Sequence, residues 1–210
     1  GQSVSKVVAD PITYAAAFDD LRLLGTGSLG IKHNSRAYES KGVQFNFDYD
    51  TTIAGTEHNF TGGARFHTDS IRRFQQQDTI DLSNGAPVVV EGAPGSGGNR
   101  WQEADSFAVW IEDNIDLGAL TLSPGIRYEQ IDGDWIDYAS DATNTVSKSA
   151  TGEIDAVVPG IGMTYALSDS TNAFGGVYKG FNMPGPSAAR DDGSPVEKET
   201  SIAKEIGVRY

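Results

Sequence analysis

Five basic side chains are the residues of this sequence best suited to bind an anionic ligand: Arg65, His67, Arg72, Arg73 and Arg127. Arginine suits carboxylates because its planar guanidinium group donates two parallel hydrogen bonds to one carboxylate. Four of the five fall within residues 65–73. Two alternatives stay open: the basic residues pair with acidic neighbours on the same surface or with another part of the protein, or "RFHTDSIRRFQQQD" is a solvated extension of a strand.

Other kinds of functional site have little support in the sequence. There is no cysteine, which excludes thiolate metal sites and cysteine nucleophiles. The histidines lack metal-site spacing, and no serine lies in a nucleophile elbow. The acidic loops "DGDWIDYASD" and "ARDDGSP" lack the calcium-loop pattern. "GTGSLG" and "GSGG" lack the strand-to-helix context of a phosphate loop, so we interpret them as flexible links.

These absences, together with the charge, narrow the classes of function. We expect no catalytic residue, no bound metal and no cofactor. The net charge of −13 and the lack of a basic run argue against a nucleic-acid partner.

Strands must position the basic residues, because polar and apolar residues alternate with a period of two. In residues 120–129 the apolar members are Leu120, Leu122, Pro124, Ile126 and Tyr128, and the polar or small ones are Thr121, Ser123, Gly125, Arg127 and Glu129. Similar patterns predict strands in residues 42–50, 58–70, 106–117, 153–167, 173–181 and 200–210, about seven in all. In "AFGGVYKGF" the two faces are ambiguous. One helix is predicted from Asp10, a possible cap, to Gly25 or Gly27.

The connections between these strands alternate between short and long. Short turns such as "TTIAGTE" and "SDSTN" alternate with long links such as "SNGAPVVVEGAPGSGGNR" and "NMPGPSAARDDGSPVEKE". Transmembrane β-barrels show this pattern, with short periplasmic turns and long extracellular loops. We therefore predict an all-β fold, a segment of a large antiparallel transmembrane barrel with one short helix near the N-terminus. Its apolar face would meet lipid, and the Arg127 face would line the lumen.

The odd number of strands suggests a piece of a larger barrel, because complete bacterial barrels have an even number. We expect residues 1–35 to form an extracellular loop with the helix, and residues 36–210 to form barrel strands and loops.

Four parts of the sequence carry a family resemblance: "FAVWIEDNIDLGALTLSPGIRYEQID", "VVPGIGMTYALSDSTNAFGGVYKGFNMPGP", "VEKETSIAKEIGVRY", and "DPITYAAAFDDLRLLG" with "SRAYESKGVQFNFDYD". They are similar to the middle of the barrel in TonB-dependent outer-membrane receptors, and the last part is closest to ferric-dicitrate-type receptors. Two details depart from the family pattern. Lys198 and Glu199 replace its usual "PE" element, and Lys204 stands where tyrosine is common.

This resemblance implies a barrel of about 22 strands with an N-terminal plug that binds TonB. We expect the plug to lie outside this chain. The implied function is uptake of a ferric chelate, a siderophore or ferric citrate, across the outer membrane of a Gram-negative bacterium. The implied partners are the chelate, the TonB complex through the plug, and outer-membrane lipid and lipopolysaccharide. The alternatives are a stand-alone outer-membrane barrel or adhesin without TonB coupling, and an enzyme on a soluble all-β scaffold.

Overall fold

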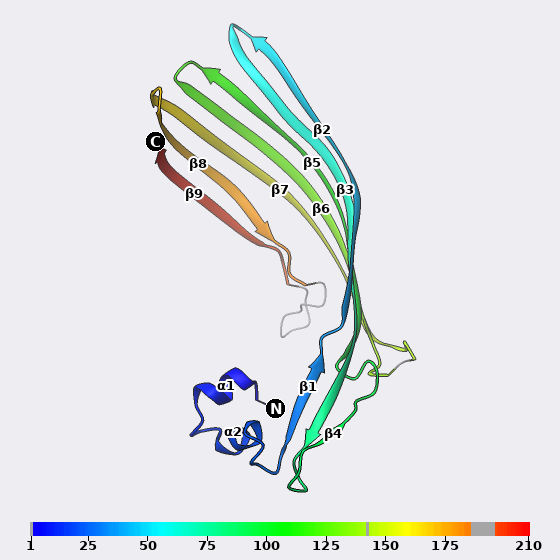
Figure 1. Ribbon diagram of the computed structural model, residues 1–210. Helices are drawn as coiled ribbons and strands as arrows, with labels where there is room; N and C mark the ends of the chain where they lie inside the picture. Colours follow the sequence, from blue (N-terminus) through cyan, green and yellow to red (C-terminus); the bar gives the residue numbers. More distant parts are fainter. Residues whose placement is uncertain (1, 142, 186–195) are drawn as a thin grey trace. The chain divides into compact units, whose positions relative to one another are not determined.

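Long antiparallel strands make up most of the computed structural model, which describes residues 2–141, 143–185 and 196–210. The described helices are α1 (Val4–Ala9) and α2 (Ala15–Leu21). The described strands are β1 (Ser28–His33), β2 (Arg36–Ile53), β3 (Thr56–Asp81), β4 (Val88–Val90), β5 (Gly98–Leu117), β6 (Leu120–Tyr138), β7 (Val146–Ser168), β8 (Thr171–Asn182) and β9 (Glu199–Arg209). The strand order is β1-β3-β5-β6-β7-β8-β9, with β2 and β4 also paired to β3 (Figure 1).

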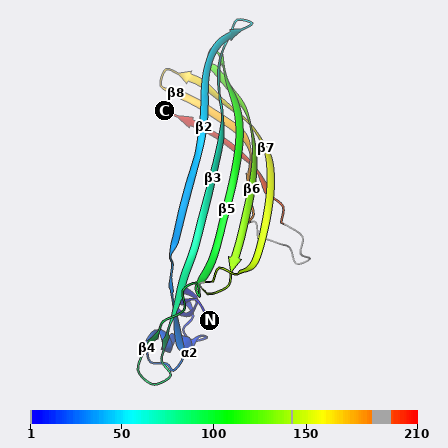
Figure 2. The same cartoon turned by 90° about the vertical axis from the view of Figure 1, so that its right-hand side faces the viewer.

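The chain divides into two compact units. The loop unit comprises Gly1–Tyr38, Ile71–Trp101 and Ile136–Lys148, and the wall unit comprises Glu39–Ser70, Gln102–Trp135 and Ser149–Tyr210. The loop unit contains both helices, β1, β4 and the neighbouring ends of longer strands. The wall unit contains the greater part of β2, β3, β5, β6 and β7 and all of β8 and β9, which follow one another in a single layer (Figure 2).

Strand register in the wall unit shows which residues share a face. Ile161 of β7 lies opposite Val177 of β8, and Tyr178 lies opposite Gly160. Side chains directly opposite each other point to the same side of a sheet. The Tyr178 hydroxyl donates to Glu205 Oε1 at 2.7 Å, so these two share the polar face and Val177 shares the apolar face with Ile161. This resolves "AFGGVYKGF": Tyr178 belongs to the polar face.

The apolar face of the wall unit is open to its surroundings. Its large exposed side chains are Phe107, Val109, Ile111, Ile126, Val157, Ile161, Met163, Val177, Ile202, Ile206 and Val208. Within the described residues, no large side chain is completely buried, as expected for a single-layered sheet without a second layer to cover it. The apolar face therefore needs a hydrophobic surrounding that this chain does not itself supply.

Two polar pairs bracket the apolar face along β3 and β5. His58 Nδ1 lies 2.7 Å from Asp113 Oδ2 at one end, and Thr68 Oγ1 donates to Asp105 Oδ1 at 2.5 Å at the other. From Asp105 to Asp113 the strand advances about 27 Å, or about 20 Å once a strand tilt of about 40° is applied. This height is close to the apolar band of about 25 Å in outer-membrane barrels.

The N-terminal segment differs from the single helix predicted there. α1 precedes Asp10 and is capped by the Ser3 side chain, which accepts from the Lys6 amide. The Asp10 carboxylate accepts from the Thr13 amide at 3.1 Å and so caps a separate turn before α2 begins. No helix among the described residues is long and apolar enough to cross a membrane.

The structure contains two short paired strands, β1 and β4, that the sequence did not predict. The "GTGSLG" stretch was predicted to be a flexible link, which is wrong: β1 begins at Ser28 and pairs with Gln76–Asp81 of β3. β4 pairs with Thr79–Asp81 of β3. The long link at residues 83–100 is thus partly strand. β3 extends to Asp81, so its last residues offer hydrogen-bonding partners to both β1 and β4. The predicted long loop at 182–199 and its "ARDDGSP" stretch lie mostly outside the described residues.

A close approach at Gly63 gives a first prediction about folding. A Cβ atom at Gly63 would lie 2.2 Å from the Phe45 carbonyl oxygen and 2.6 Å from Trp110 Cζ2. Because a backbone atom must move, we expect Gly63→Ala to lower the free energy of unfolding by about 2 kcal/mol. Urea unfolding of the lipid-reconstituted receptor that contains this chain measures the change.

Gly125 provides the matched control for that substitution. A Cβ there would meet its nearest neighbour, the Ile111 carbonyl oxygen, at 3.4 Å, which is ordinary contact. Gly125→Ala should leave the unfolding midpoint almost unchanged. Equal midpoints for the two variants would contradict tight strand packing at Gly63.

Candidate functional site

Arg127 lies on the polar face of β6 and is already paired. Its Nε donates to Glu129 Oε2 at 2.7 Å, and its guanidinium carbon lies 5.2 Å from the centre of the Trp110 ring. Ser106 Oγ donates to the other Glu129 oxygen at 3.2 Å. Arg127 is therefore neutralised by its own strand, which agrees with the alternative that the basic residues pair with acidic neighbours.

Two shallow grooves follow the polar face beside Arg127. One of about 290 Å³ includes Trp110, Ser123, Arg127, Gly160 and Tyr178 in its lining. The next, of about 470 Å³, is lined by residues that include Glu112, Asn172, Phe174, Tyr178, Glu205 and Arg209. Arg209 lies over the Phe174 ring, 5.7 Å from its centre. The linings hold the cations Arg127, Lys179 and Arg209 and the carboxylates Glu112 and Glu205, and Glu129 pairs with Arg127. With Glu129 included the charges are balanced, so this surface suits a polar protein segment better than a polyanion.

Arg65 and His67 occupy the part of β3 that belongs to the wall unit. Arg65 is exposed and forms no ion pair within the part of the chain that the structure describes. His67 is mostly buried: its Nε2 lies 3.5 Å from Asp69 Oδ2, and its Nδ1 is buried without a hydrogen-bond partner. Of these two residues, Arg65 is therefore the one with its charge available.

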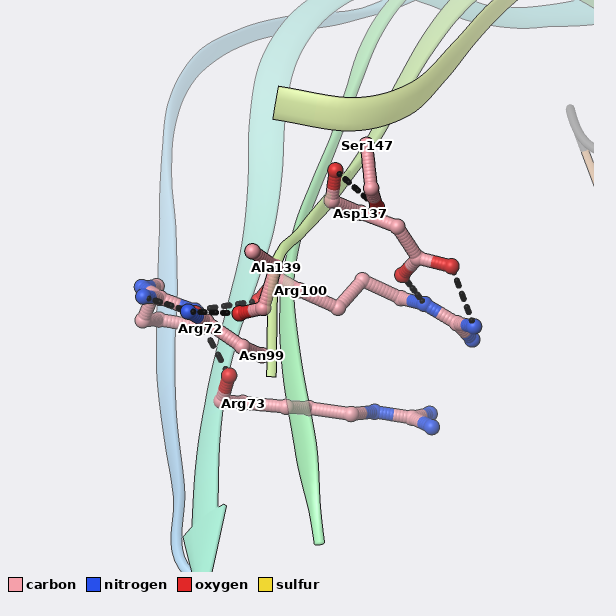
Figure 3. A network of polar contacts seen from close by, with 7 residues as sticks. All are labelled: Arg72, Arg73, Asn99, Arg100, Asp137, Ala139 and Ser147. Atoms are coloured by element: carbon pink, nitrogen blue, oxygen red, sulfur yellow. Dashed lines mark hydrogen bonds and ion pairs between the residues drawn. The ribbon is translucent and has the colours of Figure 1, made fainter. Parts of the chain in front are cut away.

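Arg72 is held inside the loop unit by a network of contacts (Figure 3). Its Nη1 donates to the carbonyl oxygens of Arg73 at 2.6 Å and Arg100 at 2.9 Å, and its Nη2 donates to Asn99 Oδ1 at 2.5 Å. Its guanidinium carbon also lies 5.4 Å from the ring centre of Phe74 and 5.2 Å from that of Tyr138. With its donors occupied in this way, Arg72 is a structural residue.

Asn99 extends this network to the loop between β6 and β7. It is only 4 % exposed, and its Nδ2 donates to the carbonyl oxygens of Ala139 at 3.0 Å and Asp141 at 2.9 Å. Arg72 and Asn99 together tie β3, the start of β5 and this loop to one another. The network explains why the loop unit is compact although it has few buried apolar residues.

Arg73 points away from Arg72, on the other side of β3 (Figure 3). Its Nε is buried without a hydrogen-bond partner, and within the described residues its guanidinium forms no ion pair. Arg100 extends toward the same side and holds Asp137 by two bonds, Nε to Oδ1 at 2.6 Å and Nη2 to Oδ2 at 3.2 Å. Arg100 is paired with Asp137, whereas the guanidinium of Arg73 has no carboxylate partner among the described residues, so its positive charge is left unbalanced on this side of the loop unit.

Arg100 was not among the predicted site residues. It is the last residue of "SNGAPVVVEGAPGSGGNR", which the sequence analysis predicts to be a long link, whereas β5 begins at Gly98. A signal was available: Arg100 continues the even-numbered series of Ala108 and Trp110, which the alternation assigns to the polar face.

Asp78 anchors the segment that follows β4. Its Oδ1 accepts from the Gly92 amide at 2.9 Å and from Gln76 Nε2 at 2.8 Å, and its Oδ2 lies 2.6 Å from His33 Nε2. The Gly92 amide, followed by Gln76 and His33, lowers the pKa of Asp78 to about 2 from an ordinary value of 3.8. The ionised carboxylate is therefore the form that the folded loop unit prefers.

This anchor predicts a dependence on acid pH. A carboxyl whose pKa is lowered on folding contributes stability above its unfolded pKa, and that contribution disappears as the pH falls through its folded pKa. We expect amides near Gly92 to lose protection from hydrogen exchange between about pH 4 and pH 2. Asp78→Asn should abolish this pH dependence and Asp19→Asn should not, because the Asp19 side chain is half exposed and its ion-pair partner is Arg22 of the same helix end, not the segment around Gly92. Retention of the transition in Asp78→Asn would contradict the assignment.

No group of three or more His, Asp or Glu side chains in the described ranges is arranged to hold a metal ion.

The five predicted site residues fall into two separate sets. Arg72 and Arg73 lie with Arg100 in the loop unit, and Arg65, His67 and Arg127 lie in the wall unit. Arg73 and Arg65 have free charge, whereas Arg72 and Arg127 are engaged.

Comparison with known protein families and solved structures matches this chain to outer-membrane receptor barrels. A family model described as "TonB dependent receptor-like, beta-barrel" matches residues 10–210. Similar solved structures include the ferric citrate transporter FecA in its unliganded form, with a TM-score of 0.70 and 20 % identity over 87 % of this chain. The ferric-catecholate import receptor Fiu from K12 E. coli has a TM-score of 0.66 and 13 % identity over 83 % of this chain. The siderophore receptor PiuA from Acinetobacter baumannii has a TM-score of 0.62 and 13 % identity over 88 %.

This chain is much shorter than those proteins. It covers 26 % of FecA, 29 % of Fiu and 31 % of PiuA. At these identities the likeness concerns the fold.

Proposed function

The chain belongs to the TonB-dependent receptor β-barrel family, and from this premise we propose that it forms part of an outer-membrane receptor that takes up a ferric chelate. The chelate is a siderophore or ferric citrate, and the membrane is the outer membrane of a Gram-negative bacterium. The open apolar face and its height of about 20 Å support a position facing lipid.

The observation that carries the proposed ligand class is the surplus of guanidinium groups beside β3 in the loop unit. Arg73 has no carboxylate partner among the described residues, whereas Arg100 is satisfied by Asp137. The chain as a whole has a net charge of −13, so a local surplus of positive charge stands out. Chelates built on carboxylates are anionic, and guanidinium groups bind carboxylates in a bidentate way.

The polar face of the wall unit supports a second part of the proposal, contact with a plug that couples to the TonB complex. Arg127 and Glu129 neutralise each other, and Tyr178 is bonded to Glu205. A surface of such balanced polar groups can exchange hydrogen bonds with another polar segment without leaving a charge unpaired. The role proposed for the polar face is contact with the plug, without any covalent step.

The test is a binding and uptake experiment with the complete receptor. We expect the tryptophan fluorescence of the purified receptor to be quenched when ferric citrate or a ferric siderophore is added. We also expect uptake of the chelate by cells to require TonB. Binding without a TonB requirement would support a stand-alone barrel. No binding to any anionic ferric chelate would overturn the proposed ligand class.

A further inference from the structure

Asp137 holds the guanidinium of Arg100 in the same way as a bound carboxylate ligand would. Arg100 Nε donates to Oδ1 at 2.6 Å and Nη2 donates to Oδ2 at 3.2 Å, so one edge of the guanidinium is paired with both oxygens of one carboxylate. Arginine usually recognises a carboxylate through two such parallel bonds. The side chains of Arg100 and Asp137 are 33 % and 28 % exposed, so the pair is accessible to a solute.

Arg73 lies beside this pair and lacks such a partner. Figure 3 shows its side chain extending toward the same side as that of Arg100, whose guanidinium is bonded to Asp137. Among the described residues no carboxylate lies within ion-pair distance of Arg73, and its Nε is buried without a hydrogen-bond partner. All three residues belong to the loop unit. They carry two positive charges and one negative charge, and the negative one occupies donors of Arg100 that an anionic ligand would use.

We propose that Asp137 determines the charge selectivity of the chelate site, because it competes with the carboxylates of the ligand for Arg100. One ligand carboxylate binds Arg73 directly, and a second binds the Nε and Nη2 edge of Arg100 only by replacing Asp137. The replaced Asp137 keeps its negative charge next to the ligand, so the repulsion grows with the negative charge of the chelate. This inference rests on the proposed function, which places an anionic ferric chelate at Arg73.

The contacts that hold the neighbouring loop do not use the Asp137 carboxylate. Ser147 Oγ donates to the main-chain oxygen of Asp137 at 3.0 Å, and Asn99 Nδ2 donates to main-chain oxygens of the loop after β6. An asparagine at position 137 has nearly the same size, and its amide oxygen still accepts one bond from Arg100. D137N therefore removes the charge and leaves the loop in place.

The test is a titration of the complete receptor in nanodiscs with ferric citrate. We expect D137N to bind ferric citrate about tenfold more tightly than the unchanged receptor, because one repulsive charge is removed and Arg100 is released from its carboxylate. This gain in affinity should shrink at about 1 M salt, where the Debye length is about 3 Å. D137E keeps the charge and should bind ferric citrate as the unchanged receptor does.

Asp134 provides the matched control for D137N. It is exposed on the same strand, β6, and the alternation of side chains places it on the opposite side of that strand from Asp137. D134N changes the net charge of the receptor by the same amount, so its affinity for ferric citrate should stay unchanged. Equal affinities of D137N and the unchanged receptor, or an equal gain in D134N, would overturn the proposal.

Chemical modification of arginine tests the control of Arg100 by Asp137 without a chelate. Phenylglyoxal reacts with guanidinium groups, and peptide mapping by mass spectrometry measures the modification of Arg100 and Arg73 separately. In D137N the modification of Arg100 should become severalfold faster, whereas that of Arg73 should keep its rate, because Asp137 is bonded to Arg100. An unchanged rate at Arg100 would overturn the proposal.

The two measurements also separate this proposal from the proposed function. If no ferric chelate bound to any variant while Arg100 was modified faster in D137N, the proposed ligand class would be wrong and the control of Arg100 by Asp137 would be supported.

Discussion

Arg73→Gln is expected to weaken binding of an anionic ferric chelate by about 10- to 100-fold, the equivalent of one charge-assisted hydrogen-bonding group. The reason is that Arg73 presents its guanidinium without a carboxylate partner among the described residues, whereas Arg100 beside it is engaged by Asp137. Arg73→Lys should have an intermediate effect, because it keeps the charge but loses the planar pair of donors. Fluorescence titration of the complete receptor measures both.

Folding should be affected little by the same substitution. The Arg73 side chain donates no hydrogen bond within the described part of the chain, so its removal leaves no acceptor unsatisfied there. Arg22→Gln is the control, because Arg22 is an exposed residue at the end of α2. Unchanged chelate affinity in Arg73→Gln, with Arg22→Gln equal to it, would remove the loop unit from the ligand site.

The strands of the wall unit could be predicted from the sequence because each alternates over many residues. A period of two along "FAVWIEDNIDL" or "LTLSPGIRYEQID" requires no knowledge of the partner strand. The family resemblance is confirmed by the match over residues 10–210. The short strands β1 and β4 could not be predicted in this way, because their six and three residues gain their structure only by pairing with the far end of β3.

The basic residues show a different limit of sequence reasoning. Arg72 and Arg73 are adjacent and were predicted as equivalent candidates, yet successive residues of a strand point to opposite sides. Arg72 finds its acceptors on Asn99 and Arg100, far along the chain, and a single sequence does not reveal such pairings. The binding role of the five predicted residues stays a prediction, and the structure divides them by the availability of their charge.

Arg72→Gln is expected to destabilise the loop unit by about 3 kcal/mol while leaving the wall unit intact. The substitution leaves Asn99 Oδ1 and the carbonyl oxygens of Arg73 and Arg100 without their donor, and buried acceptors without donors are costly. It also removes the cation from the rings of Phe74 and Tyr138. Hydrogen exchange read by mass spectrometry should show faster exchange in the segments around residues 98–101 and 137–147, with β8 and β9 unchanged.

Arg73→Gln is the matched control for this experiment, because it removes the same side chain one residue further along β3. Arg72→Lys should recover little, since a single ammonium group cannot reach acceptors on both β3 and β5 from one position. If exchange in the loop unit rose equally in the variants at 72 and 73, the distinction between a structural arginine and an available one would be wrong. If it rose only at 72, and chelate binding fell most at 73, stability and recognition would be assigned to adjacent residues on opposite faces of one strand.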